Sequence, residues 1–302
     1  MKHYTYILQI AIFLIVGNLF GQQQPNYTLY RYTMNVINPA YAAWDGETTF
    51  TSNIRSQWVN IDNAPETKSF FAATPIADRL GLGVSVITDE VFIEKTTSFN
   101  LDVSYYLPIN RDLDLYLGLK AGGRTYNVDI DGLNANLPID PAIGNVDTGF
   151  RPNVGLGAYL VHEKYFVSFS IPSLILSDRI DNDNGRVTIG TDKTHAFLSG
   201  GYNFKINRST ELRPSTLVRY VDGAPLSADL TAAVRYLERY EGGITYRTDA
   251  AWAAFFLINL TDWIDLGYAY EGTLRTELNN ITSGTHEFLV RFNLGKGLFS
   301  SY

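Results

Sequence analysis

The chain has 302 residues, a formal charge of −7 and no cysteine, so disulfides and thiolate metal sites are excluded. An acidic balance without a basic cluster also argues against nucleic-acid binding. Charged residues make up only 18% of the chain, whereas aromatic residues make up 14% and include 20 tyrosines. Tyrosine has an apolar ring and a polar hydroxyl, which suit the boundary between lipid and water, so the composition favours a membrane protein.

The first 21 residues predict a signal peptide. Lys2 and His3 precede an apolar run, Ile7–Val16, that is interrupted only by Gln9. The run is too short to cross a bilayer comfortably as a helix, and a polar stretch follows it. We expect cleavage near Gly21; the alternative is a retained N-terminal helix. No other run approaches the ~18 uninterrupted apolar residues of a transmembrane helix.

Residues 22–46 show no regular hydrophobic pattern. They are polar and aromatic, with turn signals at Pro25, Asn38-Pro39 and Asp45-Gly46. We interpret this segment as a periplasmic arm or as a plug folded into the mouth of the following domain. The predicted organisation is therefore a signal peptide (1–21), an arm or plug (22–46) and a third part that covers 47–302.

From residue 47 onward, apolar and polar residues alternate, most clearly in 99–107, 225–236 and 284–295. A period of two predicts strands with one apolar and one polar face. Several segments reach the length of about ten residues that a tilted membrane strand needs, and their polar faces mix charged residues with Ser and Gly. We predict an all-β protein, a transmembrane antiparallel barrel, because an open sheet edge in hydrocarbon would leave backbone groups unpaired.

The alternation predicts about fourteen strands, an even number as is usual in bacterial barrels. They span 47–58, 66–75, 80–88, 95–107, 113–125, 151–162, 164–172, 193–206, 210–221, 225–236, 238–248, 251–261, 263–272 and 284–295. The long links (129–150, 173–192 and 273–283) all follow odd-numbered strands. Outer-membrane barrels have short periplasmic turns and long external loops, so both termini are predicted to lie in the periplasm.

One group of residues precedes the first predicted strand, and a second group begins at the end of that strand. They are Asn35 with Asn38-Pro39-Ala40-Tyr41-Ala42, and Arg55-Ser56-Gln57-Trp58 with Ile61, Ala64-Pro65, Thr67 and Ser69. In this order, and followed by Leu80–Val86, they resemble the PorP/SprF family of the type IX secretion system of gliding and protein-secreting Bacteroidota. Ala43 stands where we would expect glycine. Alanine reaches left-handed backbone angles less easily, which puts the shape of that turn in question.

The resemblance implies an accessory outer-membrane role in type IX secretion and gliding motility, without catalysis. The implied partners are other type IX secretion components, a peptidoglycan-binding periplasmic anchor, or the C-terminal domain of a secreted surface adhesin. One alternative is an outer-membrane transport channel of the fatty-acid-transporter type with an N-terminal plug. A third interpretation is a soluble sandwich of two sheets.

Eight residues are candidates for partner binding or for holding the arm. They are Asn35, Asn38, Pro39, Tyr41, Arg55, Gln57, Trp58 and Pro65. The first four either dock a partner, fix the arm inside the barrel, or form a simple turn in which Asn supports its own backbone. Arg55 and Gln57 are predicted to point into the lumen and hold the plug, or else to contact a ligand. Trp58 is interpreted as an interfacial anchor.

No motif for chemistry stands out. His162, His195 and His286 follow no metal-ligand spacing, and the sequence contains no nucleophile elbow. The acidic stretch 181–185 places glycine fifth rather than sixth and lacks the acidic twelfth residue of a calcium loop. We therefore predict no catalytic, cofactor or metal site. The charged residues on the polar faces are expected either to form a network that fills the lumen or to select a permeating solute.

Overall fold

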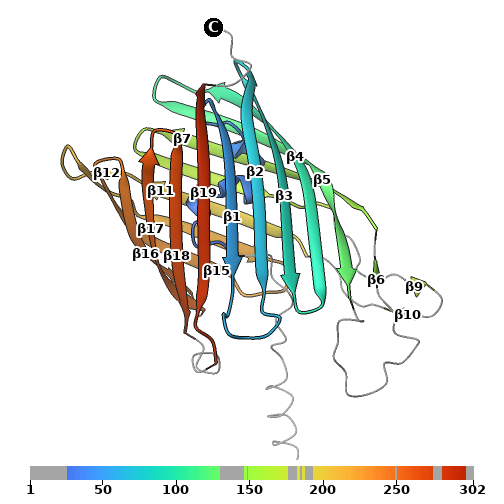
Figure 1. Ribbon diagram of the computed structural model, residues 1–302. Coiled ribbons are helices and arrows are strands. Elements are labelled where there is room, and N and C mark those ends of the chain that lie inside the picture. The colour runs from blue at the N-terminus through green and yellow to red at the C-terminus, as the bar shows by residue number, and fades with distance from the viewer. Residues whose placement is uncertain are drawn as a thin grey trace, which may run out of the picture.

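The computed structural model describes residues 26–129, 146–147, 149–175, 182–183, 186–187, 193–248, 250–274 and 281–296. They form a closed antiparallel barrel of 14 strands (Figure 1). The barrel closes because β1 (Glu47–Ser56) pairs with both β2 (Glu66–Ala77) and β19 (Thr285–Lys296). The predicted fold class is confirmed. The predicted signal peptide lies outside the described residues.

The remaining wall strands follow the chain in order. They are β3 (Leu80–Val91), β4 (Glu94–Pro108), β5 (Leu113–Val128), β7 (Arg151–His162), β8 (Tyr165–Ile171), β11 (His195–Tyr202), β14 (Ser215–Val221), β15 (Ser227–Tyr236), β16 (Tyr240–Arg247), β17 (Ala251–Thr261) and β18 (Ile264–Thr273). Short strands extend or flank them: β6 (Val146–Asp147), β9 (Asn182–Asp183), β10 (Arg186–Val187), β12 (Phe204–Lys205) and β13 (Thr210–Leu212).

Two details differ from the sequence-based expectation. The third and fourth strands are longer than predicted and are joined by Phe92 and Ile93 alone. Their polar ends pair across the hairpin, and Lys95 lies 2.6 Å from Glu90, so the ladder continues where the alternation fades. The predicted ninth strand is broken into β13 and β14 around Pro214, which has no N–H to give to a ladder.

The barrel is polar inside and apolar outside. On β1, Thr51, Asn53 and Arg55 are buried toward the lumen, whereas Ser52 and Ile54 are exposed. Large apolar side chains cover the outer face of most strands; examples are Phe70, Val84, Leu101, Leu119, Ile244 and Phe256. This distribution is the reverse of a soluble protein and fits a wall in contact with lipid. Within the described ranges, no helix is long and apolar enough to span a membrane.

The two ends of the barrel differ in the length of their links. One end, the short-link end, carries the links 78–79, 109–112, 163–164, 237–239 and 262–263. The opposite end, the long-link end, carries the β1–β2 link 57–65 and the connections from β5 to β7, β8 to β11 and β18 to β19. Lys296, the last described residue, pairs with Glu47 at the short-link end.

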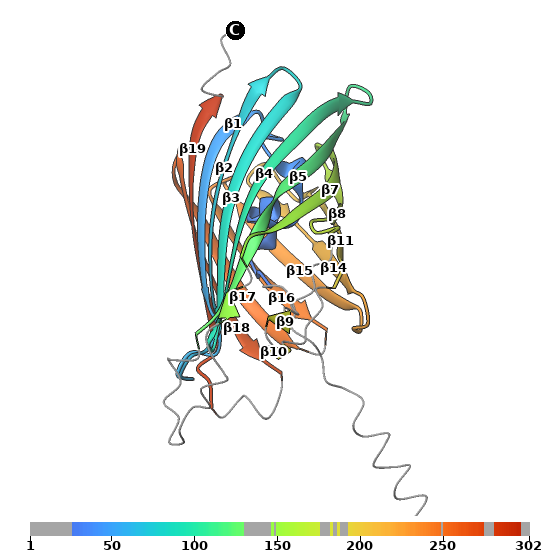
Figure 2. The same cartoon turned by 90° about the vertical axis from the view of Figure 1, so that its right-hand side faces the viewer.

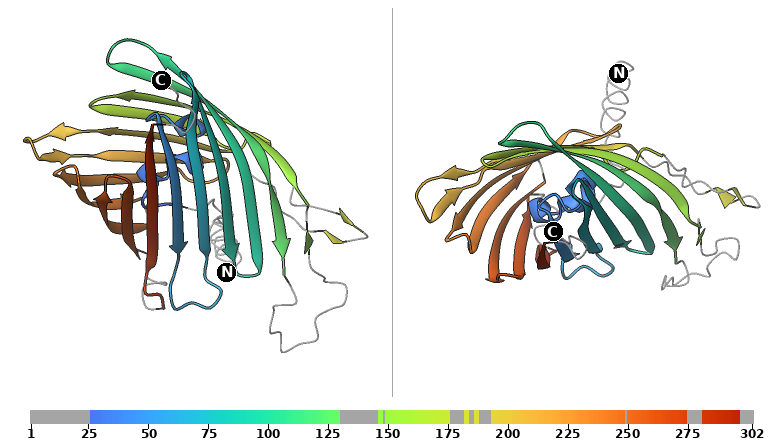
Figure 3. Two further views of the ribbon diagram at one scale, coloured as in Figure 1. Left: turned by 45° about the horizontal axis from the view of Figure 1, so that its top comes forward. Right: turned by 90° about the horizontal axis from the view of Figure 1, so that it is seen from above.

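Residues 26–46 lie inside the barrel (Figures 2 and 3), and we call them the plug. They contain η1 (Tyr30–Tyr32), α2 (Met34–Ile37) and η2 (Pro39–Tyr41). The plug starts beside the lumenal Arg55, near the long-link end of β1, and reaches the wall at Glu47. Its apolar residues Tyr30, Met34 and Ile37 pack against aromatic side chains of β7, β8 and β11.

Candidate functional site

The plug contacts two different surfaces of the lumen. The first is a line of small residues that runs across five neighbouring strands, in which each residue is the register partner of the next. This small-residue row consists of Gly81, Ser104, Gly118, Gly157 and Ser170, on β3, β4, β5, β7 and β8. All five are buried. The row presents almost bare backbone to the lumen.

The segment Asn38–Ala42 of the plug lies directly on this row. A Cβ atom added at Gly118 would stand 2.0 Å from the Ala40 nitrogen. A Cβ added at Gly157 would stand 2.0 Å from the Asn38 Oδ1, and one at Gly81 would stand 2.2 Å from the Ala42 oxygen. Real Cβ atoms do not approach so closely, so any side chain here would displace either the plug or the wall.

Asn38 joins the plug to the wall by hydrogen bonds. Its side chain is fully buried, and its Nδ2 donates to the Ala158 carbonyl at 3.0 Å and to the Ser168 hydroxyl at 2.8 Å. Its Oδ1 accepts from the Ala40 N–H at 2.9 Å, which caps η2. One side chain therefore both shapes the turn and attaches it to β7 and β8. Pro39 follows at the first position of η2, where its missing N–H costs nothing.

The end of the plug is aromatic and strained. The Tyr41 ring lies 5.3 Å from both the Trp44 and the Tyr159 rings, measured between centroids. Ala43, between them, has φ of 53°. The turn therefore adopts the left-handed conformation that favours glycine even though alanine occupies the position.

The second surface is a charge network on the opposite part of the wall. It contains three arginines and three carboxylates: Arg55, Arg219, Arg247, Asp229, Glu271 and Glu287. Arg55 lies 2.9 Å from Glu271 and 3.2 Å from Glu287. Arg247 bridges Glu271, at 2.8 Å, and Asp229, at 2.9 Å. The three positive and three negative charges balance, as buried charges require.

The beginning of the plug is bound to this network through its backbone. Glu287 accepts hydrogen bonds from the Thr28 N–H at 2.8 Å and the Leu29 N–H at 3.2 Å. The Thr28 hydroxyl donates to Glu271 at 3.1 Å. Asn53 donates to Glu287 at 2.9 Å, so the carboxylate is held by both wall and plug. Because Glu287 binds backbone amides, this contact fixes the path of the chain and does not depend on the side chains at positions 28 and 29.

The structure separates the eight candidate residues into three places. Asn35, Asn38, Pro39 and Tyr41 belong to the plug, and Arg55 to the charge network. Gln57, Trp58 and Pro65 lie in the β1–β2 link at the long-link end. There the Gln57 N–H donates to the Pro65 carbonyl at 2.9 Å, and Trp58 has φ of 49°. Gln57 therefore lies beyond the end of β1 and not beside Arg55 in the strand.

Several residues of this site were not singled out from the sequence. Glu287 and Thr28 bring the end and the beginning of the chain together, and no local pattern reveals such a contact. Gly118 and Gly157 belong to no sequence motif. The available signal was the placement of glycine at lumen-facing positions of adjacent strands, where a close approach of another backbone is a usual reason for glycine.

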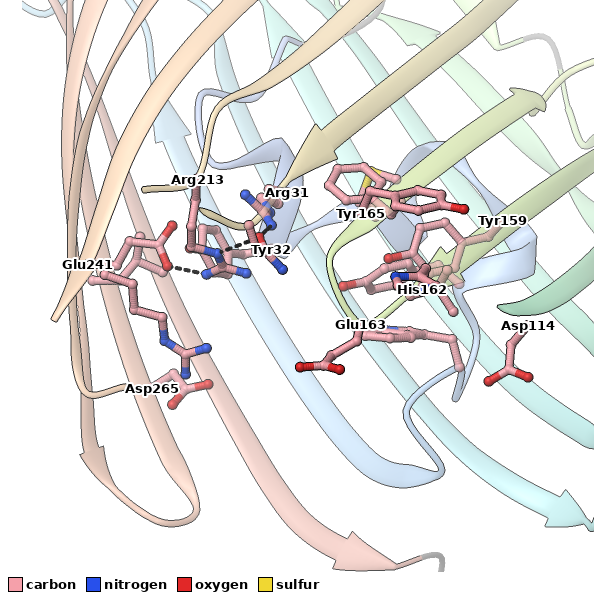
Figure 4. Close-up of a pocket in the computed structure, with 18 of the residues that line it drawn as sticks. Arg31, Tyr32, Asp114, Tyr159, His162, Glu163, Tyr165, Arg213, Glu241 and Asp265 are labelled. Atoms are coloured by element: carbon pink, nitrogen blue, oxygen red, sulfur yellow. Dashed lines mark hydrogen bonds and ion pairs between the residues drawn. The ribbon is translucent and has the colours of Figure 1, made fainter. Parts of the chain in front are cut away.

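A cavity of about 710 Å³ remains on the short-link side of the plug (Figure 4), and we call it the vestibule. Tyr41 and Trp44 of the plug, with Tyr116 and Tyr159 of the wall, form one side of it. Arginines lie on the other side: Arg31 of the plug, and Arg213 and Arg291 of the wall. In the part of the chain that the structure describes, no three His, Asp or Glu side chains are grouped as metal ligands would be.

Arg31 is the cation at the base of the vestibule. Its Nη2 donates to the Asn203 side-chain oxygen at 2.8 Å, and its guanidinium lies 5.1 Å from the Phe166 ring centre. Burial, together with the neighbouring Arg213 guanidinium, lowers the pKa of Arg31. Arg213 itself is paired with Glu241. The vestibule is therefore aromatic on one side, and its other side combines arginines with the carboxylates Glu241 and Asp265.

A closed barrel with an apolar exterior, a polar lumen and links of unequal length defines the chain as an outer-membrane β-barrel protein. The model of the type IX secretion system membrane protein PorP/SprF family matches residues 19–292. The chain belongs to this family and is an outer-membrane component of type IX secretion. No curated protein sequence matches it.

The solved structures to which the chain is similar include an outer-membrane protein and two porins. Omp33 of Acinetobacter baumannii has 12% identity and a TM-score of 0.47, over 82% of this chain and 98% of that one. The NanC porin has 9% identity and a TM-score of 0.39, over 81% and 98%. A mutant porin of Rhodopseudomonas blastica has 8% identity and a TM-score of 0.35, over 82% and 98%.

Proposed function

We propose that this protein is an accessory component of type IX secretion that acts by binding and not by catalysis. Its partner is a periplasmic part of the machine, such as a peptidoglycan-binding anchor, or the C-terminal domain of a secreted surface adhesin. The barrel holds this contact at the outer membrane. The observation that carries the proposal is the plug, which is fixed to both sides of the lumen.

The contacts of the plug favour a platform over a transport channel. Asn38 is fully buried against β7 and β8, and the Thr28 and Leu29 amides are bound by a buried carboxylate. Moving the plug out of the lumen would break the hydrogen bonds from Thr28 and Leu29 to Glu287 and those from Asn38 to the wall, and each buried polar group left unsatisfied costs about 1–3 kcal/mol. A barrel that is closed in this way is better suited to present surfaces than to conduct solutes.

We further propose that the short-link end faces the periplasm, as link lengths do in other outer-membrane barrels. The vestibule then opens toward the periplasmic machinery, and Lys296 lies on the same side. The long-link end, with the β1–β2 link that contains Trp58 and Pro65, is then the external surface. Candidate contacts for a secreted adhesin lie there.

The test is a detergent pull-down of the tagged protein from its own cells, with partners identified by mass spectrometry. Recovery of secretion components or of an adhesin is expected. The outcome that contradicts the proposal is recovery of neither, together with steady conductance of the purified protein in a planar bilayer, which would support the transport channel. Deletion of residues 22–46 then shows whether the plug segment carries the contact, because partner recovery would fall.

A further inference from the structure

Five arginines and five carboxylates line the vestibule: Arg31, Arg111, Arg213, Arg235 and Arg291, with Asp112, Asp114, Glu163, Glu241 and Asp265. Arg31 and Arg291 both line it, and among the described residues neither has a carboxylate oxygen within ion-pair distance. Arg291 instead donates to the Tyr32 carbonyl, and its guanidinium lies 5.9 Å from the Tyr32 ring centre. Elsewhere in the lumen, every arginine of the charge network has a carboxylate partner. In this respect Arg31 and Arg291 differ from the arginines of the charge network, while Asp265 is the register partner of Arg291 on the neighbouring strand.

These cations are held in place by neutral groups. Arg31 is fixed by Asn203 and by the face of Phe166, and Arg291 by the Tyr32 carbonyl and ring. Stacked and hydrogen-bonded guanidinium groups lose little freedom when they bind an anion, and they favour carboxylate because its two oxygens match their paired donors. The Arg31 Nη1 is also buried without a hydrogen-bond partner among the described residues.

The opposite side of the vestibule suits an apolar group. The Tyr116 and Tyr159 rings lie 6.5 Å apart and the Tyr159 and Phe166 rings 5.9 Å apart, between centroids. Figure 4 shows Tyr159 and Tyr165 facing the cavity from one side while Arg31 and Arg213 face it from the other. The volume, about 710 Å³, falls within the range of about 300–1,000 Å³ typical of ligand pockets.

We infer that the vestibule is a binding site for a carboxylate that carries an aromatic or aliphatic side group, the chemistry of the C-terminal residue of a polypeptide. Arg31 and Arg291 bind the carboxylate, and the tyrosines with Trp44 bind the side group. Because the opening is at the short-link end, the ligand enters from that side. Only the source of the ligand, a protein of the secretion machinery or its cargo, rests on the proposed function.

The test uses the purified full-length protein in detergent and measures binding by calorimetry. The probes are the dipeptide acetyl-Leu-Phe with a free carboxylate, the same dipeptide with a C-terminal amide, and octanoate. We expect the free acid to bind at least tenfold more tightly than the amide. Tighter binding of octanoate than of the dipeptide acid would identify a fatty carboxylate as the ligand and overturn the polypeptide assignment.

Two variants connect binding to the arginines. Arg31→Gln and Arg291→Gln are each expected to weaken binding of the free acid at least tenfold and to leave the amide unchanged. Arg239→Gln is the matched control, because this exposed arginine lies at the same end and, among the described residues, donates to the Asn259 and Leu260 carbonyls alone. Equal binding of acid and amide, no binding of either, or equal weakening by all three variants would overturn the inference.

Migration of unheated samples on gels verifies that each variant is folded. A pull-down that fails while the acid binds would contradict only the proposed function.

Discussion

The two surfaces that hold the plug work by different physics. The small-residue row on β3 to β8 holds Asn38–Ala42 by shape, since bare backbone meets bare backbone and one amide side chain supplies the polar contacts. The charge network around β1 and β14 to β19 holds Thr28 and Leu29 by fixed charges. The fit on the small-residue row should tolerate a change of side-chain charge but not of side-chain volume. The charge network should tolerate neither the loss nor the displacement of a charged group. Substitutions on the two surfaces should therefore behave differently.

The largest effect is expected from Glu287→Ala. This change leaves Arg55 with one carboxylate in place of two, and it leaves the Thr28 and Leu29 amides unpaired. We expect the free energy of unfolding to fall by about 3–5 kcal/mol, the usual cost of breaking a buried charged pair. Denaturant titration of the protein in lipid vesicles measures this. Because the network then holds three arginines and only two carboxylates, the loss should persist when residues 22–46 are also deleted. A loss that vanishes there would show that the network serves the plug alone.

Gly118→Val should have the next largest effect, of about 1–3 kcal/mol or more, because the new side chain overlaps the Ala40 backbone. The plug should become loose, so that trypsin cleaves after Arg31, which is half-buried in the wild type. The control is Gly242→Val on β16, where an added Cβ meets nothing closer than 3.8 Å. In contrast to Glu287→Ala, this defect should disappear when residues 22–46 are deleted; an undiminished defect would mean that the row stabilises the wall itself.

Asn38→Ala should cost about 1–2 kcal/mol, from the loss of the η2 cap and of the bonds to Ala158 and Ser168. Protease accessibility of the plug should rise less than for Gly118→Val, because the fit to the row is preserved. Asn207→Ala, which removes an exposed side chain that caps a short link, serves as the control. A cost equal to that of the control would show that shape alone holds this part of the plug.

The smallest effect is expected from Ala43→Gly. Ala43 has φ of 53°, which costs alanine about 1 kcal/mol, so glycine should be neutral or stabilising by less than about 1 kcal/mol. The gain is limited because glycine has more freedom to lose on folding and because the buried methyl of Ala43 is removed. Thermal unfolding in detergent compares it with Ala42→Gly, which should only destabilise. A clear loss for Ala43→Gly would show that the methyl contact outweighs the strain.

The barrel could be predicted from the sequence because its determinants are local. Alternation within each segment gave the strands, and turn residues with link lengths gave the two kinds of end. The last residues of the third strand, 89–91, and the first of the fourth, Glu94, were missed, since polar residues on both faces remove the alternation while the ladder continues. The contacts of the plug could not be predicted. The small-residue row exists only through the register of five strands, and its members lie as far apart in the sequence as Gly81 and Ser170.

The same limit applies to the charged residues. Arg55 was predicted to face the lumen from its position on β1, but its partners Glu271 and Glu287 come from β18 and β19. Which carboxylate meets which arginine depends on the closure of the barrel, for which no local signal exists. The family resemblance rests on Asn38 and Arg55 together, yet the structure places them apart. Asn38 attaches the plug to the small-residue side of the wall, whereas Arg55 belongs to the charge network that binds Thr28.

The contact of Thr28 with Glu287 also has a consequence for assembly. The two residues are 259 positions apart, and Glu287 lies on the strand that pairs with β1 to complete the barrel. The plug cannot bind this carboxylate until the last strand has been synthesised and inserted, and contacts of such long sequence separation form slowly. The order of events is therefore constrained: the first residues of the described chain must already lie within the curved, open sheet when β1 and β19 meet. The pairing of β1 with β19 and the binding of the plug to Glu287 therefore form one late kinetic step.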